Sequence, residues 1–212
     1  MYMPTKVEIL AGLTELANQY SNIAIAWHVI ILMIIAALFV GWKPGNSLMI
    51  LLLGSLLMSV SVFASLQGNF FNAAVFAFLV IMSIYATLRS GNGNITGDRS
   101  WLDIGGLILI IFGLFYPEFL TSGSLIEYAY ASPTGLIPCP TLSVLTGFAL
   151  VYKGFRSQTW SMTIGISGMF YGLFGVIYLG MNIDWVLVAG AGLLLMNTLL
   201  LSRNAFLPGN VH

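Results

Sequence analysis

Charged residues are scarce in this sequence. They make up 7% of the 212 positions, against about 25% in an average soluble domain. Such a chain has too few polar side chains to cover a surface in water, whereas a lipid bilayer removes that requirement. Seven basic and seven acidic residues balance to a net charge of zero, with no basic patch among aromatic residues. These shortages exclude a soluble domain and argue against nucleic acid as a partner.

Cysteine and histidine are equally scarce. Cys139 is the only cysteine, and His28 and His212 are the only histidines. No disulfide can therefore form within the chain, and a bis-histidine haem is disfavoured. The sequence motifs of serine hydrolases, zinc proteases, P-loop enzymes and dinucleotide-binding enzymes are absent. We predict no cofactor and favour a non-enzymatic role. A lone cysteine makes a poor metal site unless other ligands converge on it. A metal site that joins Cys139, His28 and a carboxylate stays open, because all of them are expected on the same side of the membrane.

Apolar residues are abundant. Hydrophobic side chains fill 58% of the sequence, and the mean hydropathy is +0.95. Crossing a bilayer takes a helix of about 20 apolar residues. Seven stretches meet or approach this length, and the fifth is short: 23–42, 46–66, 70–88, 102–120, 139–153, 160–180 and 184–201. The sequence predicts an all-α integral membrane protein with a bundle of seven transmembrane helices.

The two ends of the chain differ from this membrane domain at 23–201. Within 1–22, apolar residues recur at roughly helical spacing, which predicts a short amphipathic helix on the membrane surface. Residues 202–212 are expected to form a short cytoplasmic tail. The first apolar run is long enough to span and lacks a small-residue cleavage site, so we expect no secretory signal peptide.

The basic residues indicate an orientation. With seven spans, one side of the membrane receives six of them, and the other side receives only Lys6. The six are Lys43, Arg89, Arg99, Lys153, Arg156 and Arg203. Because basic residues favour the cytoplasmic side, we predict the N-terminus outside and the C-terminus inside.

The same alternation gathers unusual side chains at the outer face. We predict a candidate site there, formed by Trp27, His28, Glu118, Glu127, Pro138, Cys139, Pro140 and Asp184. The alternative interpretation is that the acids are solvated loop charges. No acidic or basic residue sits clearly in the middle of a predicted span, which argues against a proton pump or a voltage sensor.

The segment 131–147, ASPTGLIPCPTLSVLTG, holds three of the seven prolines and the sole cysteine. Pro133 pushes the preceding residue towards extended geometry. Pro138 and Pro140 suit the first turn of a helix, where missing N–H donors cost nothing. Two interpretations stay open. The segment is either a rigid outer loop that begins a helix cleanly, or a re-entrant segment that presents Cys139 to a pocket.

Glycines mark one helix for close packing. Gly165, Gly168, Gly172 and Gly175 are spaced 3, 4 and 3 residues apart and share one helical face. Small residues at this spacing allow two membrane helices to approach closely. A polar path through the bundle is the alternative.

Several stretches resemble a family of small bacterial integral-membrane proteins catalogued only as a domain of unknown function. The stretches are YSNIAIAWHVI at 20–30, GNFFNAAVFAF at 68–78, GLFYPEFLTSG at 113–123, PCPT at 138–141 and WSMTIGISG at 160–168. The resemblance implies six to seven spans in a bacterial inner membrane, and some family members carry a permease label. This chain has His28 where the family usually has proline.

Three functional hypotheses follow. The first is a small-solute permease or transport-related protein with an outward-facing polar site. The second is a non-catalytic accessory subunit of a larger membrane complex, with other membrane proteins as partners besides the lipid bilayer. The third is a membrane-bound holder of a metal or cofactor that uses Cys139 or His28.

Overall fold

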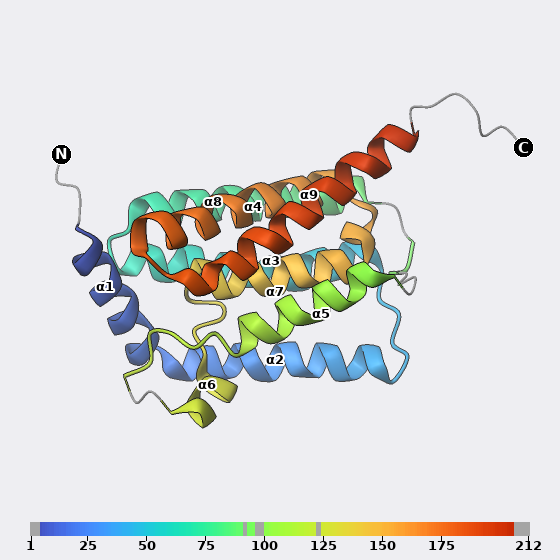
Figure 1. The fold of residues 1–212 in the computed structure, drawn as a ribbon. Coiled ribbons are helices and arrows are strands. Elements are labelled where there is room, and N and C mark those ends of the chain that lie inside the picture. The colour runs from blue at the N-terminus through green and yellow to red at the C-terminus, as the bar shows by residue number, and fades with distance from the viewer. Residues whose placement is uncertain (1–4, 91–92, 96–99, 122–123, 206–212) are drawn as a thin grey trace, which may run out of the picture.

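The computed structural model describes residues 5–90, 93–95, 100–121 and 124–205, with the backbone alone at 202–205. These residues form nine α-helices and no strand (Figure 1). The helices are α1 Lys6–Gln19, α2 Ser21–Phe39, α3 Asn46–Leu66, α4 Phe70–Arg89, α5 Trp101–Leu114, α6 Leu125–Ala131, α7 Pro138–Val151, α8 Gln158–Leu173 and α9 Trp185–Ala205.

Three shorter helical pieces interrupt or join these helices. A tight turn, η1, covers Lys153–Arg156 between α7 and α8. A π-helix, η2, continues α8 over Phe174–Leu179. A single 3₁₀ turn, η3, covers Asn182–Asp184 and leads into α9.

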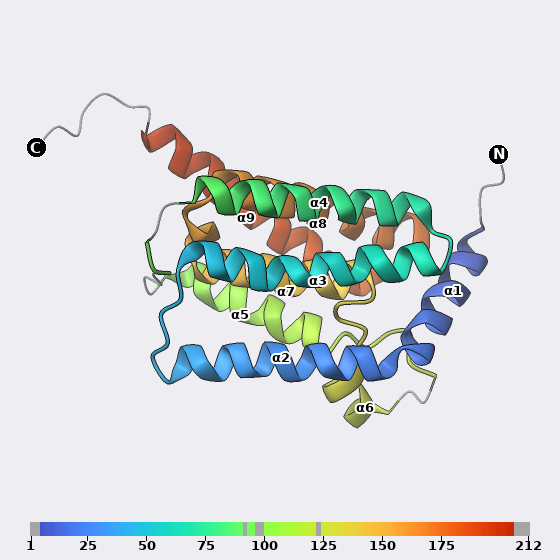
Figure 2. The same ribbon diagram turned by 180° about the vertical axis from the view of Figure 1, so that it is seen from behind.

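The helices form an elongated bundle. In Figures 1 and 2, α2, α3, α4, α5, α7, α8 and α9 run side by side and alternate in direction, while α1 and α6 lie at one end. Among the described residues, five helices are long and apolar enough to cross a membrane, and α5 and α7 are shorter apolar helices. The architecture is consistent with an all-α, multi-pass membrane protein.

Two helix ends differ from the predicted spans by more than three residues. The expected span 102–120 stops being helical after Leu114, because Tyr116 precedes Pro117 and a residue before proline is pushed out of the helical region. At the other end of the chain, α9 continues to Ala205 and takes in the start of the expected tail. The rest of that tail, 206–212, lies outside the described residues, as do Arg99 and the side chain of Arg203.

The N-terminal segment folds as a capped helix. The Thr5 hydroxyl accepts from the Glu8 N–H at 3.4 Å, and the Glu8 carboxylate accepts from the Thr5 N–H at 2.7 Å. This reciprocal pairing satisfies two amide groups at the start of α1. The inward side of α1 buries Leu16 and Ala17, and the helix covers one end of the bundle.

Helix α7 is the core of the molecule. Every residue from Pro138 to Leu150 is buried, so the helix has no exposed face over that range. Its closest neighbour is α5, and glycines bring the two backbones together. A Cβ added at Gly113 would lie 2.5 Å from the Pro140 carbonyl oxygen. One added at Gly147 would lie 2.5 Å from the Gly106 carbonyl oxygen.

A second close contact joins α8 to α9. The glycines Gly165, Gly168 and Gly172 all face α9. A Cβ at Gly165 would lie 2.8 Å from Leu195, and one at Gly172 would lie 2.8 Å from Val188. Gly175, one turn further on, faces Asp184 from within the π-helix.

Candidate functional site

The connector between α6 and α7 lies inside the bundle. Residues 132–137 are buried and not helical. The Thr134 hydroxyl donates to the Gly113 carbonyl at 2.7 Å, and the Gly135 N–H donates to the Thr141 hydroxyl at 2.8 Å. These bonds satisfy polar groups that would otherwise be buried without partners. The segment therefore combines features of both interpretations, since it enters the protein and also begins α7 cleanly at Pro138.

The two prolines position the cysteine. Pro138 and Pro140 occupy the first turn of α7, and Cys139 between them is buried and faces α8. Its thiol lies 3.8 Å from the Tyr171 carbonyl oxygen, a weak hydrogen bond. The Tyr171 hydroxyl donates to the Asn72 side chain at 2.9 Å and so ties α8 to α4.

Asp184 is the most unusual side chain of the site. It is 0% exposed. The Tyr116 hydroxyl donates to its Oδ1 atom at 2.8 Å. Its Oδ2 atom has no hydrogen-bond partner among the described residues. The Cys139 thiol lies close enough to interact with both Asp184 and Tyr116. A carboxylate, a phenol and a thiol thus meet between three segments far apart in sequence.

The π-helix makes room for this carboxylate. A Cβ at Gly175 would collide with the Oδ2 atom of Asp184, so only glycine fits there. The wider π turn ends at Gly180, whose φ of 70° lies in the left-handed region that favours glycine. Single π turns inside α-helices often occur at functional sites. Here the π-helix places Gly175 opposite the buried acid.

Trp27 and His28 reach the connector from α2. The Trp27 indole N–H donates to the Ser59 hydroxyl at 2.9 Å, and its ring fills the space beside Gly135. His28 is buried, with Nδ1 2.9 Å from the Ala24 carbonyl oxygen and Nε2 2.8 Å from that of Leu114. Both ring nitrogens thus face backbone carbonyl oxygens. His28 therefore links α2 to the end of α5.

The two glutamates of the predicted site lie nearer the surface. Glu118 is half-buried, and this burial raises the pKa of its carboxyl group above the ordinary value. It lies within electrostatic range of Asp184. Glu127 is half-buried in the first turn of α6. The structure thus brings Cys139, Asp184 and Glu118 into one region, and Trp27 and His28 contact that region through the connector and α5.

The hypothesis of a metal site made of Cys139, His28 and a carboxylate is not supported. Within the described part of the chain, no three histidine, cysteine or acidic side chains come together to hold a metal ion. The physical reason is local, because both ring nitrogens of His28 face backbone carbonyls.

Sequence reasoning missed both tyrosines. Tyr116 lies 68 residues from Asp184, and Tyr171 lies 99 residues from Asn72. No periodicity or motif connects residues at such separations. The one available signal was the Tyr116–Pro117 pair, which marks the end of a helix and therefore a polar, non-helical position within an apolar stretch.

Comparisons of the chain with protein-family models, curated proteins and solved structures find no match. The resemblance to the bacterial membrane family stays a prediction.

Proposed function

We propose that this protein transports a small solute across a membrane, with Asp184 binding the solute or a coupling cation. The observation that carries the proposal is the fully buried carboxylate with one oxygen lacking a hydrogen-bond partner. Burying such a group is costly unless a proton, a cation or donors compensate it. Ionisable residues within membrane spans commonly mark substrate or ion pathways.

The short lengths of α5 and α7 support a binding site inside the membrane near Asp184. Each has 14 residues. At about 1.5 Å per residue such a helix is about 21 Å long, whereas the hydrocarbon layer is about 30 Å thick. The end of α5 and the start of α7 both lead into the Asp184 region. Short or interrupted helices of this kind surround the binding sites of many transporters.

The described charges support seven spans with the N-terminus outside. Lys43, Arg89, Lys153 and Arg156 lie at the bundle end opposite α1, and Lys6 lies on α1 (Figure 1). This distribution matches the preference of basic residues for the cytoplasmic side. In this orientation the Asp184 region lies nearer the outer face, and the proposed location in a bacterial inner membrane rests on the family resemblance alone.

Helix α1 is the element that covers the proposed site from outside. The Lys6 ammonium lies against Gly180, where it would be 2.7 Å from an added Cβ. Gly180 ends the π-helix that contacts Asp184. A solute arriving from this side requires α1 or its neighbouring loops to move, because Asp184 and Cys139 are both buried in the described conformation.

Cys139 provides a test that does not depend on knowing the solute. In sealed proteoliposomes, a membrane-impermeant maleimide is expected to alkylate Cys139 slowly and from the outer side alone. Protons and Na⁺, supplied as gradients and followed with fluorescent indicators, are the flux probes. Asp184→Asn is expected to abolish flux, while the exposed Glu15→Gln is the matched control. Absence of flux together with complete protection of Cys139 in the folded protein contradicts the proposal.

One observation favours an accessory subunit as the second candidate. Helix α2 lies at the edge of the bundle, and only 22% of the residues in its 18-residue apolar stretch are buried. Val29, Leu32 and Met33 expose large apolar surfaces there, which another membrane protein could cover as well as lipid. Native mass spectrometry after gentle extraction from the protein's own membranes separates the candidates. A larger assembly of fixed stoichiometry supports the subunit role.

A further inference from the structure

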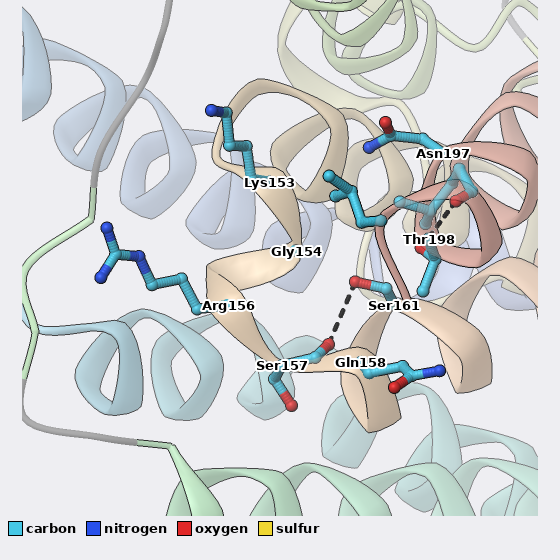
Figure 3. Close-up of a pocket in the computed structure, with 10 residues that line it drawn as sticks. Lys153, Gly154, Arg156, Ser157, Gln158, Ser161, Asn197 and Thr198 are labelled. Carbon is cyan, nitrogen blue, oxygen red and sulfur yellow. Dashed lines mark hydrogen bonds between the residues drawn. The ribbon is translucent and has the colours of Figure 1, made fainter. Parts of the chain in front are cut away.

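Polar groups lie near both ends of α7, and only those at its start are closed off. Beyond its last turn, a pocket of about 210 Å³ lies between the turn Lys153–Arg156, the start of α8 and α9 (Figure 3). Lys153 and Arg156 are exposed, and their charged ends point away from the pocket. At the first turn of α7, by contrast, Asp184, Cys139 and Tyr116 are all buried. The cover over this end therefore decides whether a solute reaches it.

The ring of Phe119 forms part of that cover. It stacks on the ring of Tyr116, with the two centroids 6.0 Å apart and the planes inclined by 13°. Phe119 is 8% exposed and Tyr116 is 0% exposed, so Phe119 is the one nearer the surface. Because the Tyr116 hydroxyl donates to Asp184, a displacement of Phe119 uncovers the partner of the buried carboxylate.

The backbone of Phe119 is strained. Its φ angle is 76°, in the left-handed region where the Cβ of a bulky residue lies too close to its own backbone. A residue stays in such a conformation only where its surroundings hold it there. Without those contacts, Phe119 would return to a negative φ and its ring would point elsewhere. The cover is therefore an element with two arrangements, and the strain favours the one that is not observed.

The side-chain amide of Asn18, on α1, holds this strained segment. Its Nδ2 atom donates to the Phe119 carbonyl at 2.8 Å and to the Thr14 carbonyl at 2.6 Å. Its Oδ1 atom accepts from the Thr121 N–H at 3.1 Å and from the Thr121 hydroxyl at 2.8 Å. An amide has two donors and two acceptor positions, and all four are used. Three of the four bonds join α1 to residues 119–121.

Helix α1 also reaches the other side of the site. It lies at the end of the bundle (Figures 1 and 2) and contacts η2, whose Gly175 faces the Oδ2 atom of Asp184. The buried Leu16 and Ala17 contribute apolar contacts, which have no preferred direction. The directional hydrogen bonds of Asn18 therefore fix where residues 119–121 lie relative to α1.

We propose that residues 115–121 form a gate over the Asp184 region, with Asn18 as its latch and the Phe119 ring as its moving part. When the Asn18 bonds break, Phe119 leaves its positive φ, its ring separates from Tyr116, and Asp184 and Cys139 become accessible from the side of α1. Asn18 acts on the site through residues 119–121 and is a positioning residue. The inference rests on the proposed function, since it takes the Asp184 region as the place where a solute enters.

The test measures how fast Cys139 reacts when the latch is removed. The full chain is reconstituted in sealed liposomes, a membrane-impermeant maleimide is added outside, and mass spectrometry follows the Cys139 peptide over time. Asn18→Leu removes all four hydrogen bonds at similar size. It is expected to react at least about tenfold faster than wild type, because each lost hydrogen bond is worth roughly fivefold in an equilibrium constant. Gln19→Leu removes the exposed amide next in the chain and is expected to match wild type.

Two further variants separate a gate from general loosening. Phe119→Ala removes the ring but keeps the carbonyl that Asn18 binds, and it is expected to speed the reaction as well. The double variant Asn18→Leu/Phe119→Ala is expected to react no faster than the faster single variant, because both changes open the same gate, whereas independent effects multiply. Thermal unfolding identifies the folded variants. Thr121→Val removes one bond and is expected to give about a fivefold increase, which keeps the test valid if Asn18→Leu does not fold.

Proton and Na⁺ flux in the same liposomes distinguishes failure of the gate from failure of transport. If no protein carries flux and the labelling differences remain, transport at Asp184 is wrong and the gate stands. If wild type carries flux that Asp184→Asn abolishes, but Asn18→Leu and Phe119→Ala label Cys139 at the wild-type rate, the gate is wrong and transport stands. Multiplied rates in the double variant also overturn the gate.

Discussion

The two ends of α7 differ in how they treat polar groups. At its start, Cys139 lies between two prolines, beside a carboxylate that is 0% exposed. Just past its end, a strained turn carries Lys153 and Arg156 at the rim of an open pocket. The first end buries a carboxylate and the second keeps its charges near the surface. One end is therefore suited to a gated site, whereas the other leaves the charged side chains of Lys153 and Arg156 exposed.

The comparison also separates two uses of glycine. At the contact of α7 with α5, Gly106, Gly113 and Gly147 allow backbones to touch, and no left-handed conformation is involved. At the turn after α7, Gly154 has a φ of 60° and also avoids a collision with Ser161. The first use builds the core around α7, and the second shapes the pocket at its end.

The largest effect is expected from breaking the core that both ends share. In Gly106→Ala the new Cβ would lie 2.7 Å from the Gly147 carbonyl oxygen, so α5 and α7 must move apart. Overpacking of this kind costs roughly 1–3 kcal/mol. Its neighbour Gly105 is the matched control, because a Cβ there meets only Leu193 at 3.9 Å. Thermal unfolding in detergent measures both variants. Equal midpoints would show that the glycine contact does not limit stability.

The next effect concerns the closed end alone. Tyr116→Phe removes the hydroxyl group that donates to the Oδ1 atom of Asp184. Because Oδ2 already lacks a hydrogen-bond partner among the described residues, both carboxylate oxygens are then unsatisfied. Leaving a buried polar group unsatisfied costs roughly 1–3 kcal/mol. We expect a lower unfolding midpoint and faster maleimide labelling of Cys139. Tyr130→Phe, on the exposed side of α6, is the control. Unchanged labelling in Tyr116→Phe would mean that this hydrogen bond does not hold the site shut.

A smaller change of opposite sign is expected at the open end. Arg156→Gly relieves a positive φ of 55°. The gain is limited to about 1 kcal/mol, because glycine loses more backbone entropy on folding. The variant should be slightly more stable than wild type, as measured by thermal unfolding in detergent. Lys43→Gly, at a position without positive φ, should bring no gain. Loss of stability in Arg156→Gly would mean that its side-chain contacts outweigh the strain.

The smallest effect is expected at Glu118. Because burial raises the pKa of this carboxyl in the folded protein, protonation favours folding. That stabilisation is present in acid and is lost as the pH rises through the raised pKa. Glu118→Gln cannot ionise, so it should match wild type near pH 4 and unfold at a slightly higher temperature than wild type above pH 7. Identical pH profiles of the unfolding midpoint would contradict this expectation.

Sequence patterns predicted the helices well where composition alone determines them. The long apolar runs that became α3 and α4 begin and end within a residue of the expected limits, because Lys43–Asn46 and Gln67–Asn69 are turn-forming sequences. Pro117 was the overlooked signal for the early end of α5. The start of α7 followed from Pro138 and Pro140, whose constraint is local.

The polar contacts of the candidate site could not be predicted from the sequence as the helix limits were. Asp184 looks like a loop acid beside Asn182, and its burial depends on Tyr116 and Gly175 from other helices. The glycines of α5 matter because α7 packs against them. The sequence of α5 alone does not predict which helix packs there. Nothing in the letters Lys153 to Arg156 predicts a left-handed turn, since three of the four residues disfavour it. These features arise from tertiary packing.

The complete burial of α7 has a consequence for biosynthesis. The ribosome releases α7 before α8 and α9, which later cover it, so for a time α7 has α5 and α3 as neighbours but not α8 and α9. Its sequence suits that interval. The Thr141 and Ser143 hydroxyls donate to carbonyls of the preceding turn, at 2.7 and 2.8 Å, and need no other helix. Thr146 lacks such a bond and lies next to Gly168 of α8. An unfinished chain would therefore hold α7 as a hairpin with α5 until α8 is inserted.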